Sequence, residues 1–258
     1  MSIDDIGRPA TSGFGYGFLA LLAAAFLAAP RSVASAGTPS AEVDICINET
    51  SPKLQIRACT RVIDDWGPAN ARLAWAYHHR GNGYSDAQDY DRAIRDYDTV
   101  IRLKPAEAHA HLDRGLAYDG RGAYGRAIQD FDAAIRLDPG FAVAYVDRCY
   151  SLAILGQAKR ALRDCDKALQ LDPADPGALD SRGYAHLRLG NLDAAIADYD
   201  AALKIYPELD TSLYGRGVAY AAKGNRQRAA RDLAAGRKIN AKIDRDMAKV
   251  HVVAPAGL

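Results

Sequence analysis

The chain has 258 residues, of which 33 are lysine or arginine and 32 are aspartate or glutamate, so its formal net charge at pH 7 is +1. Proteins that hold nucleic acid place positive charge against the phosphates, and this near-neutral balance gives no electrostatic reason to bind it. The sequence also lacks the motifs of nucleotide-binding loops, zinc proteases and serine hydrolases, so it does not support an enzymatic activity.

The first 36 residues are predicted to be an export signal. The apolar run Phe18–Ala29 is too short to span a bilayer comfortably, and the A-x-A cleavage motif Ala34–Ala36 follows it. We therefore expect the mature chain to begin at Gly37, in the periplasm of a bacterium and without membrane insertion. Because Arg8 is the only basic residue before the apolar run, an uncleaved anchor in the inner membrane is the alternative.

The next segment, residues 37–73, is predicted to be a partial repeat that caps the N-terminal end. Its stretch QIRACTRVIDDW, residues 55–66, aligns with RAIRDYDTVIRL, residues 92–103. Gly67 and Pro68 then mark a longer linker before the first complete unit.

A regular repeat follows. Prolines at 105, 139, 173 and 207 are spaced by 34 residues, and each ends a near-copy of the same phrase. With each proline at position 32 of its unit, the five predicted units are 74–107, 108–141, 142–175, 176–209 and 210–241. A fixed period of this length indicates a stack of identical supersecondary units, which buries its core between neighbours and needs no second domain.

Each unit is predicted to be a pair of helices. Apolar residues at positions 4, 11, 20, 24 and 27 give each helix one buried face. Glycine at position 15 in units two to five suits the left-handed turn that ends the first helix, whereas Gln88 in unit one predicts a different turn. Glycine at position 8 in four units predicts close contact with the alanine at position 20.

Three columns carry a resemblance to a known family. Positions 8, 20 and 24 hold Gly81, Gly115, Cys149, Gly183 and Gly217; Ala93, Ala127, Ala161, Ala195 and Ala229; and Tyr97, Phe131, Cys165, Tyr199 and Leu233. Together with the proline at position 32, they resemble the tetratricopeptide repeat (TPR) family. The resemblance implies an all-α, right-handed superhelical solenoid of antiparallel helix pairs, and a binding scaffold rather than an enzyme.

The end of the chain, residues 242–258, is predicted to be a capping helix and a tail. Ile243, Met247 and Val250 are spaced i, i+4 and i+7, with charged residues between them. This pattern is typical of a terminal helix with an apolar inner and a polar outer face. We expect residues 251–258 to be frayed.

Cysteines are predicted to form disulfides. Cys46 and Cys59 stand on facing positions of two paired helices, and a resemblance to exported bacterial TPR proteins with two early cysteines favours their pairing. The alternative is two buried thiols. Cys149 and Cys165 occupy positions 8 and 24 of one repeat, where the other repeats have mostly glycine and an aromatic residue. This joint replacement also favours a disulfide, unless the two positions are too far apart.

Two charged columns recur. Arginine at position 7 (Arg80, Arg114, Arg148, Arg182, Arg216) is predicted to pair with aspartate at position 23 (Asp96, Asp130, Asp164, Asp198, Asp232). For the aspartates at position 25 we predict i,i+4 pairs on the helix surface, namely Asp98–Arg102, Asp132–Arg136 and Asp200–Lys204. We favour these structural interpretations over a calcium site or an anion-binding ladder.

No cofactor and no metal are predicted. His78 and His109 could approach each other on adjacent first helices, but two histidines without a third ligand are a weak metal signal.

The resemblance implies a concave groove built from positions 2, 5, 9, 12 and 13 of the first helices. The residues that we predict to line it are Leu112, Leu116, Val143, Val146, Tyr150, Ile154, Tyr184, Tyr214 and Val218. At position 6, where some TPR groups place asparagine to bind a carboxylate, this chain has Asp113 and Asp147. We therefore expect the groove to bind a neutral or basic peptide segment through apolar contacts.

The sequence thus predicts an exported TPR scaffold that binds a protein or peptide partner, for assembly of a cell-envelope complex. The alternatives are a self-associating structural module and an accessory subunit of an envelope enzyme.

Overall fold

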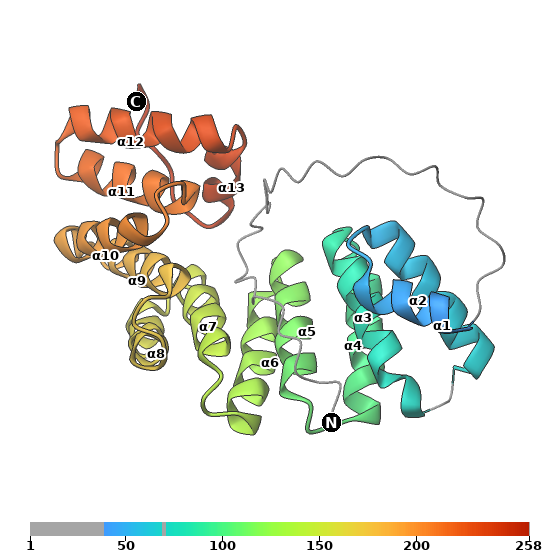
Figure 1. Cartoon of the computed structure of the whole chain (residues 1–258). Helices are drawn as coiled ribbons and strands as arrows, with labels where there is room; N and C mark the ends of the chain where they lie inside the picture. The colour runs from blue at the N-terminus through green and yellow to red at the C-terminus, as the bar shows by residue number, and fades with distance from the viewer. Residues whose placement is uncertain (1–38, 69–70, 258) are drawn as a thin grey trace. The chain divides into compact units, whose positions relative to one another are not determined.

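The computed structural model describes residues 39–68 and 71–257, which form thirteen α-helices and one short 3-10 helix (Figure 1). The predicted signal, with Phe18–Ala29 and the expected terminus at Gly37, lies outside the described residues. Within the described ranges, no helix is long and apolar enough to cross a membrane. The chain forms two compact units, which are larger than the repeats and are called the first and the second unit below. The first ends at Arg121 and the second begins at Gly122.

The first unit contains five α-helices and the 3-10 helix. Its elements are α1 (Pro39–Asn48), α2 (Pro52–Trp66), η2 (Ala71–Leu73), α3 (Ala74–Asp86), α4 (Tyr90–Leu103) and α5 (Ala108–Gly120). Each α-helix packs on the next, and α3 also contacts α1 and α5. Buried Cys46, Cys59, Val62 and Tyr77 join α1, α2 and α3 into one core.

The second unit contains eight helices. They are α6 (Tyr124–Leu137), α7 (Ala142–Ile154), α8 (Ala158–Leu171), α9 (Pro176–Arg188), α10 (Leu192–Ile205), α11 (Asp210–Ala222), α12 (Arg226–Ile239) and α13 (Ile243–Lys249). The first helices α7, α9 and α11 contact one another in sequence, and α8, α10 and α12 pair with them. The predicted all-α fold of consecutive antiparallel helix pairs, a TPR solenoid, is confirmed.

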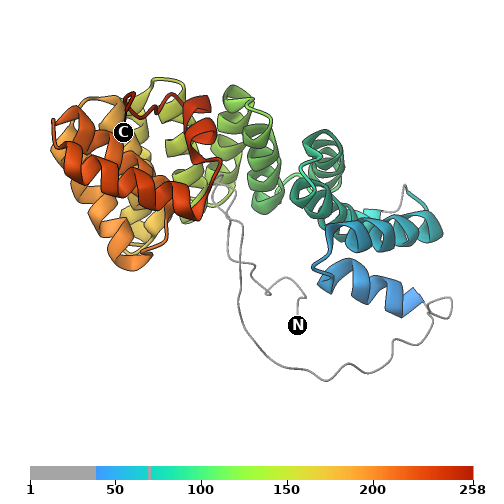
Figure 2. The same ribbon diagram turned by 90° about the horizontal axis from the view of Figure 1, so that it is seen from above.

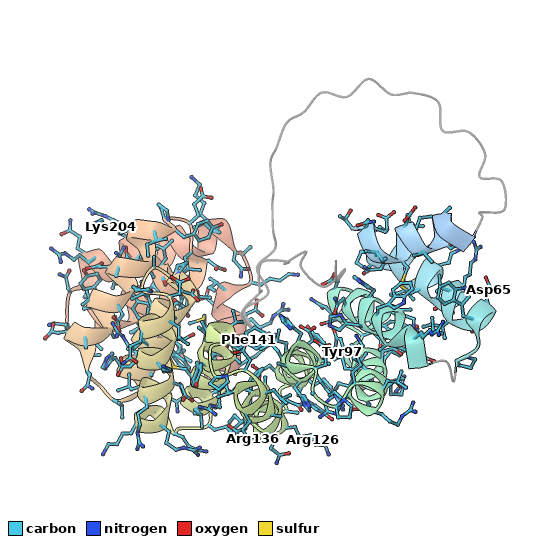
Figure 3. All side chains as sticks on the ribbon, turned by 60° about the horizontal axis from the view of Figure 1, so that its bottom comes forward. Asp65, Tyr97, Arg126, Arg136, Phe141 and Lys204 are labelled. Carbon is cyan, nitrogen blue, oxygen red and sulfur yellow. A yellow bond between two sulfur atoms is a disulfide. The ribbon has the colours of Figure 1, made fainter. Side chains whose placement is uncertain are left out.

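Side chains follow the helical periodicity. Tyr97 lies among the helices of the first unit, whereas the exposed Arg126, Arg136 and Lys204 extend from helices of the second unit (Figure 3). Apolar residues therefore fill the space between helices, and charged residues cover the outside.

The turn between the two helices of a repeat is the same in the first repeat, residues 74–107, as in the other repeats. Gln88 has a φ of 60°, in the left-handed region that Gly156 (76°) and Gly190 (75°) also adopt. The amide of Asp89 donates to the carbonyl of Tyr84 over 2.8 Å, as the amide of Gln157 does to Leu152. The prediction of a different turn at Gln88 is wrong, because the capping hydrogen bonds stabilise even a residue that has a Cβ.

The glycine at position 8 faces position 24 rather than the alanine at position 20. A Cβ on Gly183 would lie 2.9 Å from Cε1 of Tyr199, and one on Gly217 would lie 2.8 Å from Cγ of Leu233. The predicted contact with position 20 is therefore wrong. The large side chain at position 24 fills the space that the missing Cβ leaves.

This contact predicts opposite effects for two glycine replacements. Gly183→Ala should lower the free energy of unfolding by about 2 kcal/mol, because the buried Tyr199 ring cannot move away from the new methyl group. Gly125→Ala, in α6, meets nothing within 4 Å and should raise it by about 0.5 kcal/mol. Urea unfolding of both variants checks this, and a loss of equal size in both would contradict it.

Candidate peptide-binding face

The arginines at position 7 of the repeats form ion pairs with aspartates inside the fold. Nε and one terminal nitrogen of Arg148 donate to the two carboxylate oxygens of Asp164 over 2.8 and 2.6 Å. The same bidentate ion pair joins Arg80 to Asp96, Arg182 to Asp198 and Arg216 to Asp232. The predicted pairing of positions 7 and 23 is confirmed for these four repeats.

The other terminal nitrogen of each arginine reaches the preceding unit. Arg114 donates to Asp98 over 2.6 Å, and Arg148 donates to Asp132 over 2.6 Å. Arg182 pairs with Asp166, and Arg216 with Asp200, in the same way. The predicted surface pairs of Asp98, Asp132 and Asp200 are wrong, because position 25 faces the first helix of the next unit, where a half-buried guanidinium lies within reach.

Both pairs of cysteines form disulfides. The Cα atoms are 4.7 Å apart for Cys46–Cys59 and 5.6 Å apart for Cys149–Cys165, and all four residues are fully buried. The second bond occupies positions 8 and 24, where other units pack glycine against a large side chain. The close approach of these two positions explains why two cysteines can be joined there.

We expect each disulfide to stabilise the fold by about 3 kcal/mol, because its short loop removes chain entropy from the unfolded state. Replacing Cys149 and Cys165 together by serine should lower the free energy of unfolding by that amount. Mass spectrometry after alkylation without reductant tests the pairing directly. Four alkylated thiols in protein from an oxidising compartment would refute it.

Histidines pair with carboxylates. Nε2 of His78 lies 2.5 Å from Oδ2 of Asp113, and Nδ1 of His109 lies 3.8 Å from a carboxylate oxygen of Glu107. Over the described residues, no group of three histidine, cysteine, aspartate or glutamate side chains is placed to hold a metal ion.

The predicted groove residues are mostly covered. In the first unit Leu112 is buried and Leu116 half-buried. In the second unit Val143 and Val218 are half-buried, whereas Val146, Tyr150, Ile154, Tyr184 and Tyr214 are buried. The nine residues thus fall in both units, and few of them present a free apolar surface.

Positions 5 and 9 of α7, α9 and α11 form one continuous face in the second unit, here called the first-helix face. Its members are Val146, Tyr150, Asp180, Tyr184, Tyr214 and Val218. The rings of Tyr150 and Tyr184 have centroids 5.9 Å apart, so the aromatic residues of neighbouring repeats meet.

The C-terminal segment Ile243–Ala254 lies on this face. The hydroxyl of Tyr184 donates to the carbonyl of Val250 over 2.5 Å. The hydroxyl of Tyr214 donates to Asp244 over 3.0 Å and accepts from the amide of Ala254 over 3.1 Å. Burial raises the pKa of both tyrosines, so both hydroxyls remain protonated donors at neutral pH. Figure 2 shows the red end of the chain among the helices of this unit.

The segment is a short helix followed by a tight turn. Ile243, Met247, Val250 and Val252 are all buried. His251 adopts a φ of 64°, and the amide of Val252 donates to the carbonyl of Met247 over 2.9 Å, which reverses the chain after α13. The predicted capping helix forms, but the prediction of a frayed tail from His251 onward is wrong as far as Ala254, because the tail packs on the first-helix face.

The two acids at position 6 already have surroundings within the fold. Asp113 pairs with His78, and Asp147 is buried. Sequence reasoning missed Asp180, which is fully buried and accepts hydrogen bonds from the hydroxyls of Ser212 and Thr211. Burial raises its pKa to about 7. Most other repeats have an apolar residue at position 5, so an aspartate at this position could have indicated from the sequence that Asp180 is unusual.

Comparison with known proteins agrees with this geometry. A family profile described as "Tetratricopeptide repeat" matches residues 81–148, and one described as "TPR repeat" matches residues 183–224. The period, the helix pairs and these matches define a repeat protein of the scaffold type. These two ranges carry tetratricopeptide repeats, and the helix pairs of the described residues form a TPR solenoid.

Solved structures of other TPR proteins resemble it. YrrB, described as a TPR protein with an unusual peptide-binding site, is 26% identical; the match covers 76% of this chain and 97% of YrrB, with a TM-score of 0.53. MamA from Desulfovibrio magneticus is 22% identical, covers 66% of this chain and 97% of its own, and has a TM-score of 0.56. A TPR protein from Parabacteroides merdae is 16% identical, with coverages of 81% and 85% and a TM-score of 0.66. The last two show the fold alone.

Proposed function

We propose that this chain is a scaffold whose first-helix face binds a peptide segment of a protein partner. One observation carries the proposal: this face already holds a peptide segment, the chain's own residues 243–254. Tyr184 and Tyr214 bond to main-chain groups of that segment, which any peptide offers. The likeness to YrrB, whose description names a peptide-binding site, supports the proposal.

We further propose that the scaffold acts outside the cytoplasm, in the periplasm or at the inner membrane of a bacterium, in the assembly of a cell-envelope complex. The apolar run Phe18–Ala29 followed by an A-x-A motif supports export. Two buried disulfides support it too, because such bonds persist in oxidising compartments.

The partner is expected to contribute apolar side chains. Val218 is half-buried and supplies apolar surface, and Tyr150 keeps 7% exposure, whereas Val146 is buried in the core. Asp147 and Asp180 are buried and do not present free charge. The earlier expectation that acids would select a basic segment therefore loses its main support. Tyrosine anchors with a large apolar ring and a polar tip suit the recognition of a neutral segment.

Tyr150→Ala is expected to weaken partner binding by about 1–3 kcal/mol, the usual size for an interface anchor. Tyr150 is a better test than Tyr184, whose hydroxyl already bonds to the chain's own segment. The partner would be captured from an envelope extract with the mature chain, and its affinity measured for each variant. Tyr206→Ala, at an exposed tyrosine of the same unit, is the control.

If Tyr150→Ala lowers the melting temperature but leaves partner affinity intact, the first-helix face is not the binding site. A light-scattering mass would separate the alternative of self-association, since a monomer favours a different protein as partner.

A further inference from the structure

We infer that the C-terminal segment Ile243–Ala254 is a built-in competitor for the first-helix face, and that partner segments carry the same apolar pattern as this segment. The inference rests on the proposed function and deepens it. It states what the face recognises, and that a partner has to displace the chain's own segment to bind.

The segment reaches farther than a cap requires. A cap for the last repeat needs to cover α11 and α12, and α13 contacts both (Figure 1). The chain then continues back to α9, where the hydroxyl of Tyr184 holds the carbonyl of Val250, 66 residues away in sequence. The segment therefore follows the face across two repeats, as a bound peptide would.

Recognition is divided between main chain and side chains. The two tyrosines contact the carbonyl of Val250 and the amide of Ala254, groups that do not depend on sequence. Selectivity comes from the four buried side chains, Ile243, Met247, Val250 and Val252, at spacings i, i+4, i+7 and i+9. A fitting partner segment is one turn or two of amphipathic helix, followed by a tight turn and a β-branched residue.

The segment is built to be released. Helix α13 has seven residues, too few to be stable in isolation, so its order depends on the face beneath it. Its outer side is exposed along Asp244, Arg245, Ala248 and Lys249. The bidentate ion pair between Arg237 and Asp244 is also exposed, so dissolved salt screens it and weakens its hold on the segment.

The test uses the full chain and a fluorescein-labelled peptide with the sequence of residues 241–256. Met247→Asp with Val250→Asp buries two charges under the segment and should release it. Ala248→Asp with Lys249→Asp introduces the same residues on the exposed side and is the control. In an anisotropy titration, the release variant should bind the peptide at least tenfold more tightly than the wild-type chain or the control.

Two results would overturn the inference. In one, all three proteins bind the peptide equally. In the other, the release variant is folded by circular dichroism but does not bind. If that variant unfolds, hydrogen exchange on the wild-type chain decides. The amides of Val252 and Ala254 should exchange by local opening before those of α9 and α11, and exchange only together with those helices would reject the inference.

The two proposals fail separately. If the peptide does not bind but partner affinity still depends on Tyr150, the competitor role is rejected and the peptide-binding face remains. If partner affinity is independent of Tyr150, the proposed function itself is rejected.

Discussion

Arg148→Met is expected to lower the free energy of unfolding by about 3 kcal/mol. The guanidinium of Arg148 bonds to both carboxylate oxygens of Asp164 and to one of Asp132, and so ties three helices together. Methionine keeps much of the side-chain volume but removes all three bonds. The buried carboxylate of Asp164 then loses the cation that compensates its removal from water.

Arg160→Met in the same helix pair is the matched control. Arg160 is exposed and bonds to Gln157 within its own turn, so its loss should change the free energy of unfolding by less than about 0.5 kcal/mol. Adding Asp164→Leu to Arg148→Met should recover much of the loss, because no buried charge is then left unpaired. Urea unfolding would contradict the assignment if the two single variants behaved alike.

Asp180→Asn is expected to raise the free energy of unfolding above neutral pH. Burial, the largest cause, raises the pKa of Asp180 to about 7; the nearby Asp210 adds to this, and the hydroxyls of Ser212 and Thr211 oppose it. Tyr199 also faces the group, and the Asp180 charge is one cause of its own raised pKa. Ionised Asp180 is therefore disfavoured in the folded chain.

The sign of the pH dependence follows from the raised pKa. The stability that protonated Asp180 contributes is fully present below the ordinary carboxyl pKa of 3.8 and is lost as the pH rises to about 7. The loss is about 4 kcal/mol, because one pKa unit corresponds to about 1.4 kcal/mol. Asparagine does not titrate, so the advantage of Asp180→Asn over the wild-type chain should grow by about this amount between pH 4 and pH 8.

Urea unfolding at several pH values measures this difference. Asp65→Asn, at an exposed carboxylate of α2, is the control and should show no comparable growth between the same pH values. A difference between Asp180→Asn and the wild-type chain that stays constant with pH would show that Asp180 remains ionised in the folded state.

The fold could be predicted from the sequence because the same information recurs five times. A single glycine or alanine says little, but a column at positions 8, 20 and 24 fixes the helix pairs. The pairing of positions 7 and 23 was also accessible, since both lie in one unit. Contacts between units were not, because the pairing of Asp132 with Arg148 depends on how one helix pair is set against the next.

The candidate site was only partly predictable. Positions 5 and 9 were among those predicted to line a groove, but the sequence did not indicate that the chain's own C-terminal segment covers them. The covering segment lies outside the repeat and has no columns to compare. Its turn at His251 also gave no signal, because a left-handed residue that is not glycine cannot be recognised from its type.

The placement of the two disulfides bears on how the chain acquires its bonds. Four cysteines allow three pairings. The observed one joins residues separated by 13 and 16 positions. Each bond therefore closes one helical hairpin, and a short loop costs less entropy to close than the long loops of the other pairings. A chain that emerges from its N-terminus can complete the first crosslink before Cys149 appears, so the order of synthesis itself protects against scrambling.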